Sequence, residues 1–221
     1  MKNSTLIHRR EVLAMPIAVI ISDYAKANQQ SSAKNYFMLN EEFNIDQLML
    51  PLPPADDISE AKLVLELVNN RKPEIIKDII RQDKNIIDEF ISAQKMSTFE
   101  YKYLKERLEY ALSDAAEIVD YFKKIFNRKR PNLVMPEIVP VIEVPENSAY
   151  PSGHATQAAI CAHLLTELVD KSKNELFAIA RNIAKNREIA GLHYPSDTES
   201  GLLLGTKLSK YFVNNFHKVG T

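Results

Sequence analysis

Residues 148–165 read SAYPSGHATQAAICAHLL, in which a Pro-Ser-Gly-His turn leads directly into an apolar run. The run predicts a helix over about residues 153–169. The chain has only five glycines, and one of them, Gly153, stands between a serine and a histidine at the start of this helix. The turn is therefore either an ordinary helix start or part of an anion-binding site, and the rest of the chain must decide between them.

Helical patterns dominate the chain on both sides of this stretch. Asp57 or Ser59 is predicted to cap a helix whose apolar face includes Ile58, Ala61, Leu65 and Val68. The other predicted helices run from Pro73 to Phe90, from Ser97 to Arg130, where Pro131 ends the helix, and over about 173–190 and 196–216. The long helix from Ser97 carries an apolar stripe made of Leu104, Leu108, Leu112, Ala115, Val119, Phe122 and Phe126. Prolines interrupt residues 131–151, where an irregular loop is predicted. These patterns predict an all-α fold, a single-domain helical bundle around one core.

Composition and charge exclude several classes of partner. The chain has 221 residues, and 28 Lys and Arg balance 29 Asp and Glu. Nucleic acid and anionic membranes are therefore not expected as main partners. Charges also recur every few positions in the predicted helices, so the chain is not expected to be an integral membrane protein. Cys161 has no partner for a disulfide, and we expect it to be a small buried hydrophobic residue.

The first 27 residues are interpreted as an export signal of the twin-arginine type. Arg9 and Arg10 precede an apolar run of about ten residues, and Ala25-Lys26-Ala27 lies where a cleavage site is expected. The protein is then periplasmic or secreted, and the alternative is an amphipathic helix in a cytoplasmic protein. Residues 28–56, with prolines at 51, 53 and 54, are predicted to be an extended segment, and residues 57–217 to be a helical domain.

Two basic residues form the first candidate motif. Lys123 and Arg130 are seven residues apart, so on one helix both side chains would project from nearly the same face. Together they would present two positive charges to an anion. The alternative is a basic helix C-terminus, shared with Lys124, Arg128 and Lys129, that complements the helix dipole.

The turn in the opening stretch is the second motif. Ser152 offers a hydroxyl, and Gly153 allows a backbone geometry and a close approach that a Cβ would resist. Amides at a helix N-terminus bind anions, and His154 can exchange a proton near neutral pH. The alternative is a turn with no role beyond starting the helix.

The third motif is NREIAGLHYPSD, residues 186–197, which contains Arg187, His193 and Asp197. The four-residue spacing brings His193 and Asp197 close enough to touch. A carboxylate on one ring nitrogen fixes the tautomer and leaves the other nitrogen free to attack an electrophile. The alternative is a helix cap formed by Ser196 or Asp197.

Together the three motifs resemble the signature of the type 2 phosphatidic acid phosphatase superfamily, which includes the vanadium haloperoxidases. That signature is Lys-x6-Arg-Pro, then Pro-Ser-Gly-His, then Ser-Arg-x5-His-x3-Asp. The matching segments are Lys123 to Pro131, Pro151 to His154, and Arg187 to Asp197. Within the superfamily the chain is most similar to the bacterial class A non-specific acid phosphatases, on Leu52-Pro53-Pro54, on Ser-x-Tyr-Pro-Ser-Gly-His and on Gly191-x-His-x2-Ser-Asp. The resemblance covers about residues 50–215.

The chain departs from the family pattern at three points. Asn186 stands where the family usually has serine, the loop over residues 131–151 is short, and the cysteines of many relatives are missing. Asn186 can still bond a phosphate oxygen through its amide, so we expect it to change rate or specificity rather than abolish the site.

The resemblance implies a helical bundle of the acid phosphatase and vanadium haloperoxidase type. It implies an enzyme, a metal-independent phosphomonoesterase without a cofactor, whose partner is a small-molecule substrate and whose copies associate as related soluble enzymes often do. His193 would attack phosphorus, Asp197 would orient it, and His154 would protonate the leaving oxygen. The phosphate would be bound by Lys123, Arg130, Ser152, Gly153, Arg187 and Asn186.

Three alternatives stay open. A vanadate-dependent haloperoxidase uses the same residues to hold vanadate, although such enzymes are generally much longer. A membrane lipid phosphatase would need several apolar spans of about twenty residues, which the charged helices here do not offer. A helical protein of this fold that binds phosphorylated ligands without catalysis would fail to hydrolyse an aryl phosphate.

Overall fold

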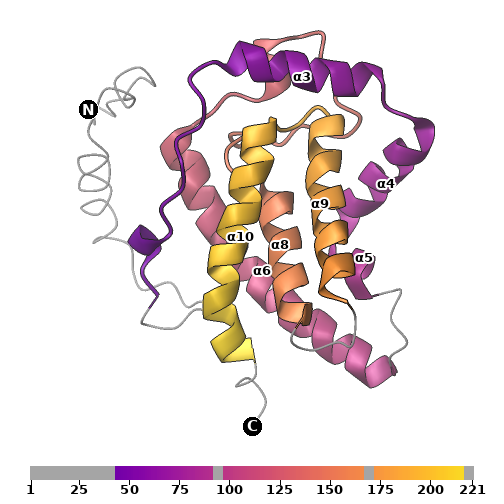
Figure 1. Ribbon diagram of the computed structural model, residues 1–221, viewed down its shortest axis with the longest axis vertical. Helices are drawn as coiled ribbons and strands as arrows, with labels where there is room; N and C mark the ends of the chain where they lie inside the picture. Colours follow the sequence, from indigo (N-terminus) through magenta and orange to yellow (C-terminus); the bar gives the residue numbers. More distant parts are fainter. Residues whose placement is uncertain (1–42, 92–96, 167–171, 217–221) are drawn as a thin grey trace, which may run out of the picture. The chain divides into compact units, whose positions relative to one another are not determined.

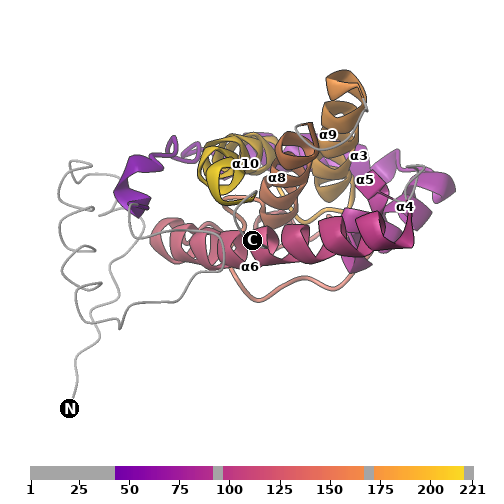
Figure 2. The same ribbon diagram turned by 90° about the horizontal axis from the view of Figure 1, so that it is seen from below.

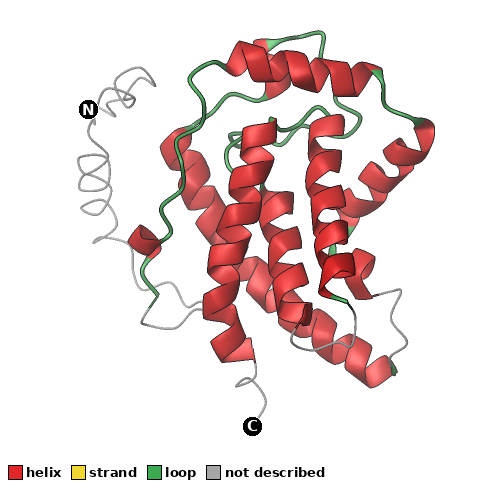
Figure 3. Ribbon diagram, viewed as in Figure 1, coloured by secondary structure: helices red, strands yellow, loops and turns green. Residues whose placement is uncertain are grey.

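The computed structural model describes residues 43–91, 97–166 and 172–216. The predicted export signal over residues 1–27 and most of the extended segment over 28–56 lie outside the described residues. The described elements are η1 (Ile45–Gln47), α3 (Asp57–Asn69), α4 (Pro73–Lys84), α5 (Ile87–Ile91), α6 (Thr98–Phe126), α7 (Pro131–Val134), α8 (Gly153–Thr166), α9 (Lys173–Ile189) and α10 (Pro195–Phe216). These ranges contain helices and no β-strand (Figure 3), so the predicted all-α fold is confirmed.

Helix α8 is the buried centre of the bundle. It contacts α6, α9 and α10, and Figure 1 shows it between α9 and α10. Figure 2 shows the long helix α6 running along one side of these three helices. Most residues of α8 are buried around the whole circumference of the helix, as expected for an unbroken apolar run. Cys161 is one of these buried residues.

Helices α8 and α10 come unusually close together at two glycines of α10. A Cβ atom on Gly201 would lie 2.5 Å from the main-chain oxygen of Ser152, and a Cβ on Gly205 would overlap that of Thr156. Side chains at these two positions would push the helices apart. The start of α8, which carries the Pro-Ser-Gly-His turn, is therefore seated directly on α10.

The long helix α6 ends earlier than predicted. Ser97 caps its N-terminus as predicted, in a capping box with Glu100. Its C-terminus is Phe126, because Asn127 adopts a left-handed conformation with φ of 43° and ends the helical ladder. Arg130 lies beyond the helix in extended backbone, the conformation that a following proline favours. The prediction that Lys123 and Arg130 share one helical face was therefore wrong.

Helix α3 differs from the prediction at its N-terminus. Its cap is Asp56, whose carboxylate accepts hydrogen bonds from the main chain of Ile58 and Ser59, and not Asp57 or Ser59. Ile58, which was assigned to the apolar face, is 56% exposed. Ala61, Val64 and Val68 form the buried face instead.

The helix predicted from Pro73 to Phe90 is broken into α4 and α5. Asn85 is extended, and its side chain accepts a hydrogen bond from the main chain of Asp88, which starts the second helix. The loop over residues 131–152 is irregular as predicted, apart from the single turn of α7. It contains a cis peptide bond between Tyr150 and Pro151. None of the helices in the described ranges has the length and apolarity that a membrane span requires.

Candidate active site

The three sequence motifs meet around His193, in the segment between α9 and α10. His193 Nδ1 lies 3.4 Å from Asp197 Oδ2, and His193 Nε2 lies 3.5 Å from Arg130 Nη1. The main chain of Ser152 donates a hydrogen bond to the carbonyl of Asp197 at 3.0 Å, which joins the second motif to the third. The motifs are 20 or more positions apart in the sequence, and the fold brings them together.

His193 is buried and uncharged in this arrangement. Burial lowers its pKa well below the usual value, and the charges of Lys123, Arg130 and Arg187 lower it further. Asp197 Oδ2 is an acceptor, which favours the tautomer with the proton on Nδ1. The lone pair of Nε2 then faces the cationic side of the cluster, as a nucleophile at an oxyanion centre requires.

Asp197 has no exposed surface, and both of its carboxylate oxygens have partners. Oδ2 accepts a hydrogen bond from the main chain of Tyr194 at 2.9 Å, and Oδ1 pairs with Arg128 Nη1 at 2.5 Å. Burial raises the pKa of Asp197, and the charge of Arg128 opposes this rise. The predicted alternative, a cap for the amides of the helix that follows, stays a prediction, because the Tyr194 nitrogen precedes α10.

Lys123 and Arg130 reach the cluster from different elements. The Lys123 ammonium donates to the carbonyl of Ser148, and the Arg130 guanidinium donates to the carbonyls of Asn147 and Leu192 at 3.0 and 3.1 Å. Both side chains are buried. Burial and the nearby charge of Arg130 lower the pKa of Lys123 to about 7. Two desolvated cations thus lie beside His193, where an anion would relieve their repulsion.

Ser152, Gly153 and His154 form the first turn of α8. Ser152 is fully buried, and its hydroxyl lies 3.4 Å from the main-chain nitrogen of Ala155. Gly153 does not have a positive φ, and a Cβ there would meet Val119 Cγ1 at an ordinary 3.7 Å. The expectation that the backbone geometry requires glycine was therefore wrong. The close approach of a ligand at this glycine stays a prediction.

His154 is 28% exposed and lies at the edge of the cluster. Its Nε2 is 3.6 Å from Asp83 Oδ1, a carboxylate that is itself 41% exposed. Burial, Arg187, His193 and Lys123 lower the pKa of His154 to about 3, so the imidazole is neutral at pH 7. His163, the other histidine of α8, lies 3.2 Å from Thr206 Oγ1. Nine residues along a helix separate the two by about 13.5 Å, so His163 does not reach the cluster.

Arg187 and Asn186 lie at the end of α9 and contact α4. Arg187 Nη1 pairs with Asp83 Oδ1 at 3.0 Å, and its Nη2 donates to the carbonyl of Ile79 at 3.0 Å. The Nε atom of Arg187 is buried and has no hydrogen-bond partner among the described residues. The amide of Asn186 donates to Gln82 and Asn182, at 2.9 and 3.3 Å, so its role as a phosphate ligand stays a prediction.

Two residues of the cluster were missed by the sequence analysis. Asp83 bridges Arg187 and His154, and no motif contains it. Arg128 was interpreted only as part of a basic helix end, although it is 1% exposed and holds Asp197. The pattern around Arg128 gave one signal: it lies between Lys123 and Arg130, close to the first motif.

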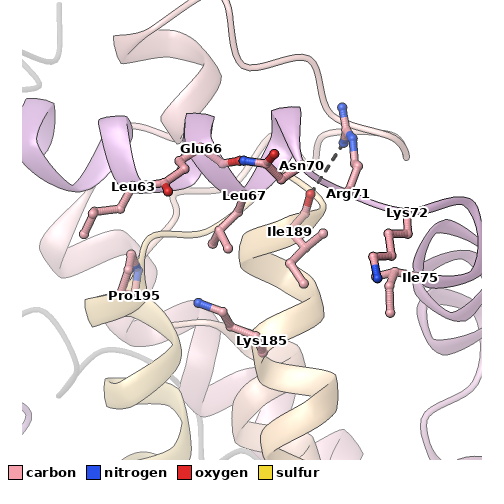
Figure 4. Close-up of a pocket in the computed structure, with 10 residues that line it drawn as sticks. All are labelled: Leu63, Glu66, Leu67, Asn70, Arg71, Lys72, Ile75, Lys185, Ile189 and Pro195. Atoms are coloured by element: carbon pink, nitrogen blue, oxygen red, sulfur yellow. Dashed lines mark hydrogen bonds between the residues drawn. The ribbon is translucent and has the colours of Figure 1, made fainter.

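A separate pocket of about 570 Å³ lies between α3, α4, α9 and the start of α10 (Figure 4). Its lining combines apolar and basic side chains, namely Leu63, Leu67, Ile75, Ile189, Arg71, Lys72 and Lys185, with Glu66, Asn70 and Pro195. None of the predicted phosphate ligands lines it. In the described ranges no group of three or more His, Cys, Asp or Glu side chains is arranged to hold a metal ion. The donors around His193 suit an oxyanion instead.

The fold and the clustered motifs define an all-α protein of the phosphatase and haloperoxidase class. The family model described as PAP2 superfamily matches residues 108–220, about half of the chain, and the chain belongs to this superfamily. The resemblance to the superfamily seen in the sequence is confirmed. No curated protein matches the chain.

Two of the solved structures that match the chain show the likeness in fold. A bacterial vanadium-dependent iodoperoxidase is 18% identical, with a TM-score of 0.64 over 87% of this chain and 64% of that one. A transmembrane PAP2-type phosphatidylglycerolphosphate phosphatase from Bacillus subtilis is 16% identical, with a TM-score of 0.52 over 73% of this chain and 86% of that one. The chain thus spans less than two thirds of the iodoperoxidase, and both likenesses concern the fold.

Proposed function

We propose that the protein is a phosphomonoesterase that acts through a phosphohistidine at His193. The observation that carries this proposal is the neutral, buried His193, with Asp197 on Nδ1 and with Lys123, Arg130 and Arg187 lowering its pKa from nearby. Phosphoryl transfer requires mainly positioning and positive charge around the transferred group. Three basic side chains supply that charge without a metal ion.

The reaction runs in two steps. In the first step His193 Nε2 forms a bond to phosphorus while the bond to the leaving oxygen breaks, and His154 gives that oxygen a proton. In the second step His154 takes a proton from water, the water oxygen bonds to phosphorus, and the bond to Nε2 breaks. Asp197 keeps the Nδ1 proton in place through both steps. Because His154 is neutral in the free protein, the negative charge of the substrate must raise its pKa before it can act as an acid.

The finer assignment, to soluble acid phosphatases of the bacterial class A type, rests on the sequence. Its supports are Leu52-Pro53-Pro54 and the spacing of the three motifs. Export to the periplasm rests on Arg9-Arg10 and the apolar run that follows, which lie outside the described residues.

A vanadate-dependent haloperoxidase is the second candidate function. What favours it is the TM-score of 0.64 with the iodoperoxidase, against 0.52 with the lipid phosphatase. A cluster that fits phosphate also fits vanadate, which is likewise a tetrahedral oxyanion. Iodide oxidation by the purified chain with vanadate and hydrogen peroxide, exceeding that of a His193→Ala control, would favour this function. Without such oxidation, vanadate should act only as an inhibitor of phosphate release.

The nucleophile provides the direct test of the phosphatase. His193→Ala is expected to abolish hydrolysis of 4-nitrophenyl phosphate, because the attacking nitrogen is lost while the basic residues stay. Asp197→Asn is expected to lower turnover by about 10⁴-fold, the effect of losing an orienting carboxylate in a catalytic triad. Release of 4-nitrophenol is measured with and without a chelator, and circular dichroism checks folding. Turnover by His193→Ala at the wild-type rate would rule out the phosphohistidine, and complete loss in chelator would rule out the metal-free account.

A further inference from the structure

Arg128 is a buried arginine at an unspecified position of the first motif, between Lys123 and Arg130. Its guanidinium contacts three carboxylates: Nε lies 3.0 Å from Asp57 Oδ1, Nη2 lies 2.6 Å from Glu60 Oε2, and Nη1 lies 2.5 Å from Asp197 Oδ1. The guanidinium carbon also lies 3.9 Å from the centre of the Tyr194 ring. The planar group is therefore held by contacts at its edges and on its face.

The contacts give the two oxygens of Asp197 different partners. Arg128 takes Oδ1, and Oδ2 is left for His193 Nδ1 and the main chain of Tyr194. A carboxylate fixed at one oxygen cannot rotate about its Cβ–Cγ bond without losing this short charged hydrogen bond. The contact of Arg128 with Oδ1 thus fixes the orientation of Oδ2 toward His193.

Arg128 also provides the nearest counter-charge of the buried carboxylate. Burial raises the pKa of Asp197, and Arg128 is the largest influence in the opposite direction, with Lys123 of α6 contributing less. Behind Arg128 lie the carboxylates of Asp57 and Glu60 on α3. Without Arg128, Asp197 would favour its protonated form, which is a weaker hydrogen-bond acceptor for the Nδ1–H group of His193 and can present a donor in its place.

We propose that Arg128 is a positioning residue that holds the Asp197 carboxylate in the orientation that fixes the tautomer of His193. The proposal rests on the proposed function of His193 as nucleophile. The competing account is a purely structural link, in which Arg128 joins α3 to the start of α10 and has no effect on the imidazole. Figure 1 shows α3 lying across the ends of α9 and α10, where such a link would act.

The test compares Arg128→Gln and Arg128→Lys with the matched control Asp57→Asn. The control keeps an oxygen acceptor for Arg128 Nε and leaves both oxygens of Asp197 untouched. The tautomer of His193 is read at pH 7 by long-range proton–nitrogen NMR of protein labelled with ¹⁵N-histidine, and a His193→Gln sample identifies its signals. The kcat, the KM and the pH profile for 4-nitrophenyl phosphate are measured on the same samples.

The wild type and Asp57→Asn should show a single Nδ1–H tautomer, and Arg128→Gln a mixture of both. Arg128→Gln should lower kcat by about 10–100-fold, the range typical of residues that orient a reacting ligand, with KM changed less than about 3-fold. The acid limb of kcat/KM should move to higher pH, and Arg128→Lys should restore part of each effect because it keeps the charge.

A single Nδ1–H tautomer in Arg128→Gln, with only a lower melting temperature, would overturn the proposal in favour of the structural link. If Arg128→Gln does not fold, Arg128→Lys takes its place in the test. A loss of kcat of about 3–10-fold in Arg128→Lys, against less than about 2-fold in Asp57→Asn, then supports the proposal. Equal losses of kcat in the two variants overturn it. If the wild type hydrolyses no phosphomonoester, the proposed function fails. The NMR comparison then still decides whether Arg128 positions the pair.

Discussion

At the level of single residues, His154 is the proposed general acid, although its imidazole is neutral in the free protein. Its ring lies beside Asp83, which also pairs with Arg187, and burial and nearby positive charges keep the imidazole neutral. A general acid must hold a proton when the leaving group departs. The phosphate dianion would offset the positive charges that lower the His154 pKa, so acid catalysis would begin only with the substrate bound.

His154→Ala should therefore slow the hydrolysis of substrates with poor leaving groups much more than that of substrates with good ones. General acid catalysis is worth about 10²–10⁴-fold, and an alkyl phosphate should lose about that much in the phosphorylation step. An aryl phosphate needs little help to depart and should lose far less in this step. Rapid-mixing measurements of the first turnover on both substrates check this, with circular dichroism as the folding control. Equal, small losses on both substrates would leave the turn as a phosphate-binding element and assign the acid role elsewhere.

The sequence could predict the members of the motifs, but not the residues that support them. His193 and Asp197 are four residues apart, so their contact follows from local spacing. Asp83 lies 104 positions before its partner Arg187 in the sequence. Arg128 lies 69 positions before its partner Asp197. Contacts over such separations depend on how α4 and the end of α6 pack, which no local pattern encodes.

At the level of elements, the start of α8 is fixed by its packing on α10. Gly201 lets the main chain of Ser152 approach closely, and the Ser152 nitrogen bonds to the carbonyl of Asp197. Gly153, only one residue after Ser152, is required neither by backbone conformation nor by packing. Substitution at each glycine can test whether Gly153 serves ligand approach while Gly201 serves packing.

Gly201→Ala should destabilise the protein, whereas Gly153→Ala should lower activity without loss of stability. The added methyl at Gly201 would clash with main chain, and overpacking of this kind costs about 1–3 kcal/mol. At Gly153, alanine favours the helix and should raise the free energy of unfolding by up to about 1 kcal/mol. Melting temperature and the inhibition constant of phosphate are measured for both variants. Unchanged phosphate inhibition and turnover in Gly153→Ala would contradict a role for this glycine in ligand approach.

Element boundaries were predictable where a local signal decides them. Ser97 and Glu100 form the capping box that begins α6, and five of the seven residues of its apolar stripe are buried. The stripe continues to Phe126, but the left-handed Asn127 ends the helix there. Arg130 consequently reaches His193 from a loop and not from the helix face that the seven-residue spacing indicated.

Across the whole molecule, the bundle keeps three basic side chains and two neutral histidines at one end. Lys123, Arg130 and Arg187 are buried within reach of His193, and the pKa of each is lowered, with burial as the largest cause. Like charges held this close destabilise the folded state when no anion is bound. The cluster should therefore make stability depend on both pH and oxyanions.

The sign of the pH dependence follows from the shifted groups. The folded pKa of His154 is about 3 against 6.5 when unfolded, and that of His193 is also lowered. Between pH 6.5 and 3 the unfolded chain thus binds more protons, and these two groups make the protein less stable as pH falls. Lys123 also makes the protein less stable as pH falls, between pH 10.5 and about 7. Asp197, whose pKa is raised, acts in the opposite direction above pH 3.8.

A bound tetrahedral dianion should restore the stability that the protein loses through Lys123 and the two histidines as pH falls. Sulfate keeps its charge between pH 5 and 9, so any change in its effect over this range reports the protein's own groups. It should bind more tightly as Lys123 gains its proton, and at 100 times its Kd it should add about 2.7 kcal/mol to the free energy of unfolding. The rise in melting temperature at a few millimolar sulfate should be larger at pH 6 than at pH 9. In Lys123→Met the effect of sulfate should be smaller and should lose its dependence on pH near 7, whereas the exposed control Lys124→Met should behave as the wild type. An equal effect of sulfate at pH 6 and pH 9 in the wild type would show that Lys123 does not bind the anion.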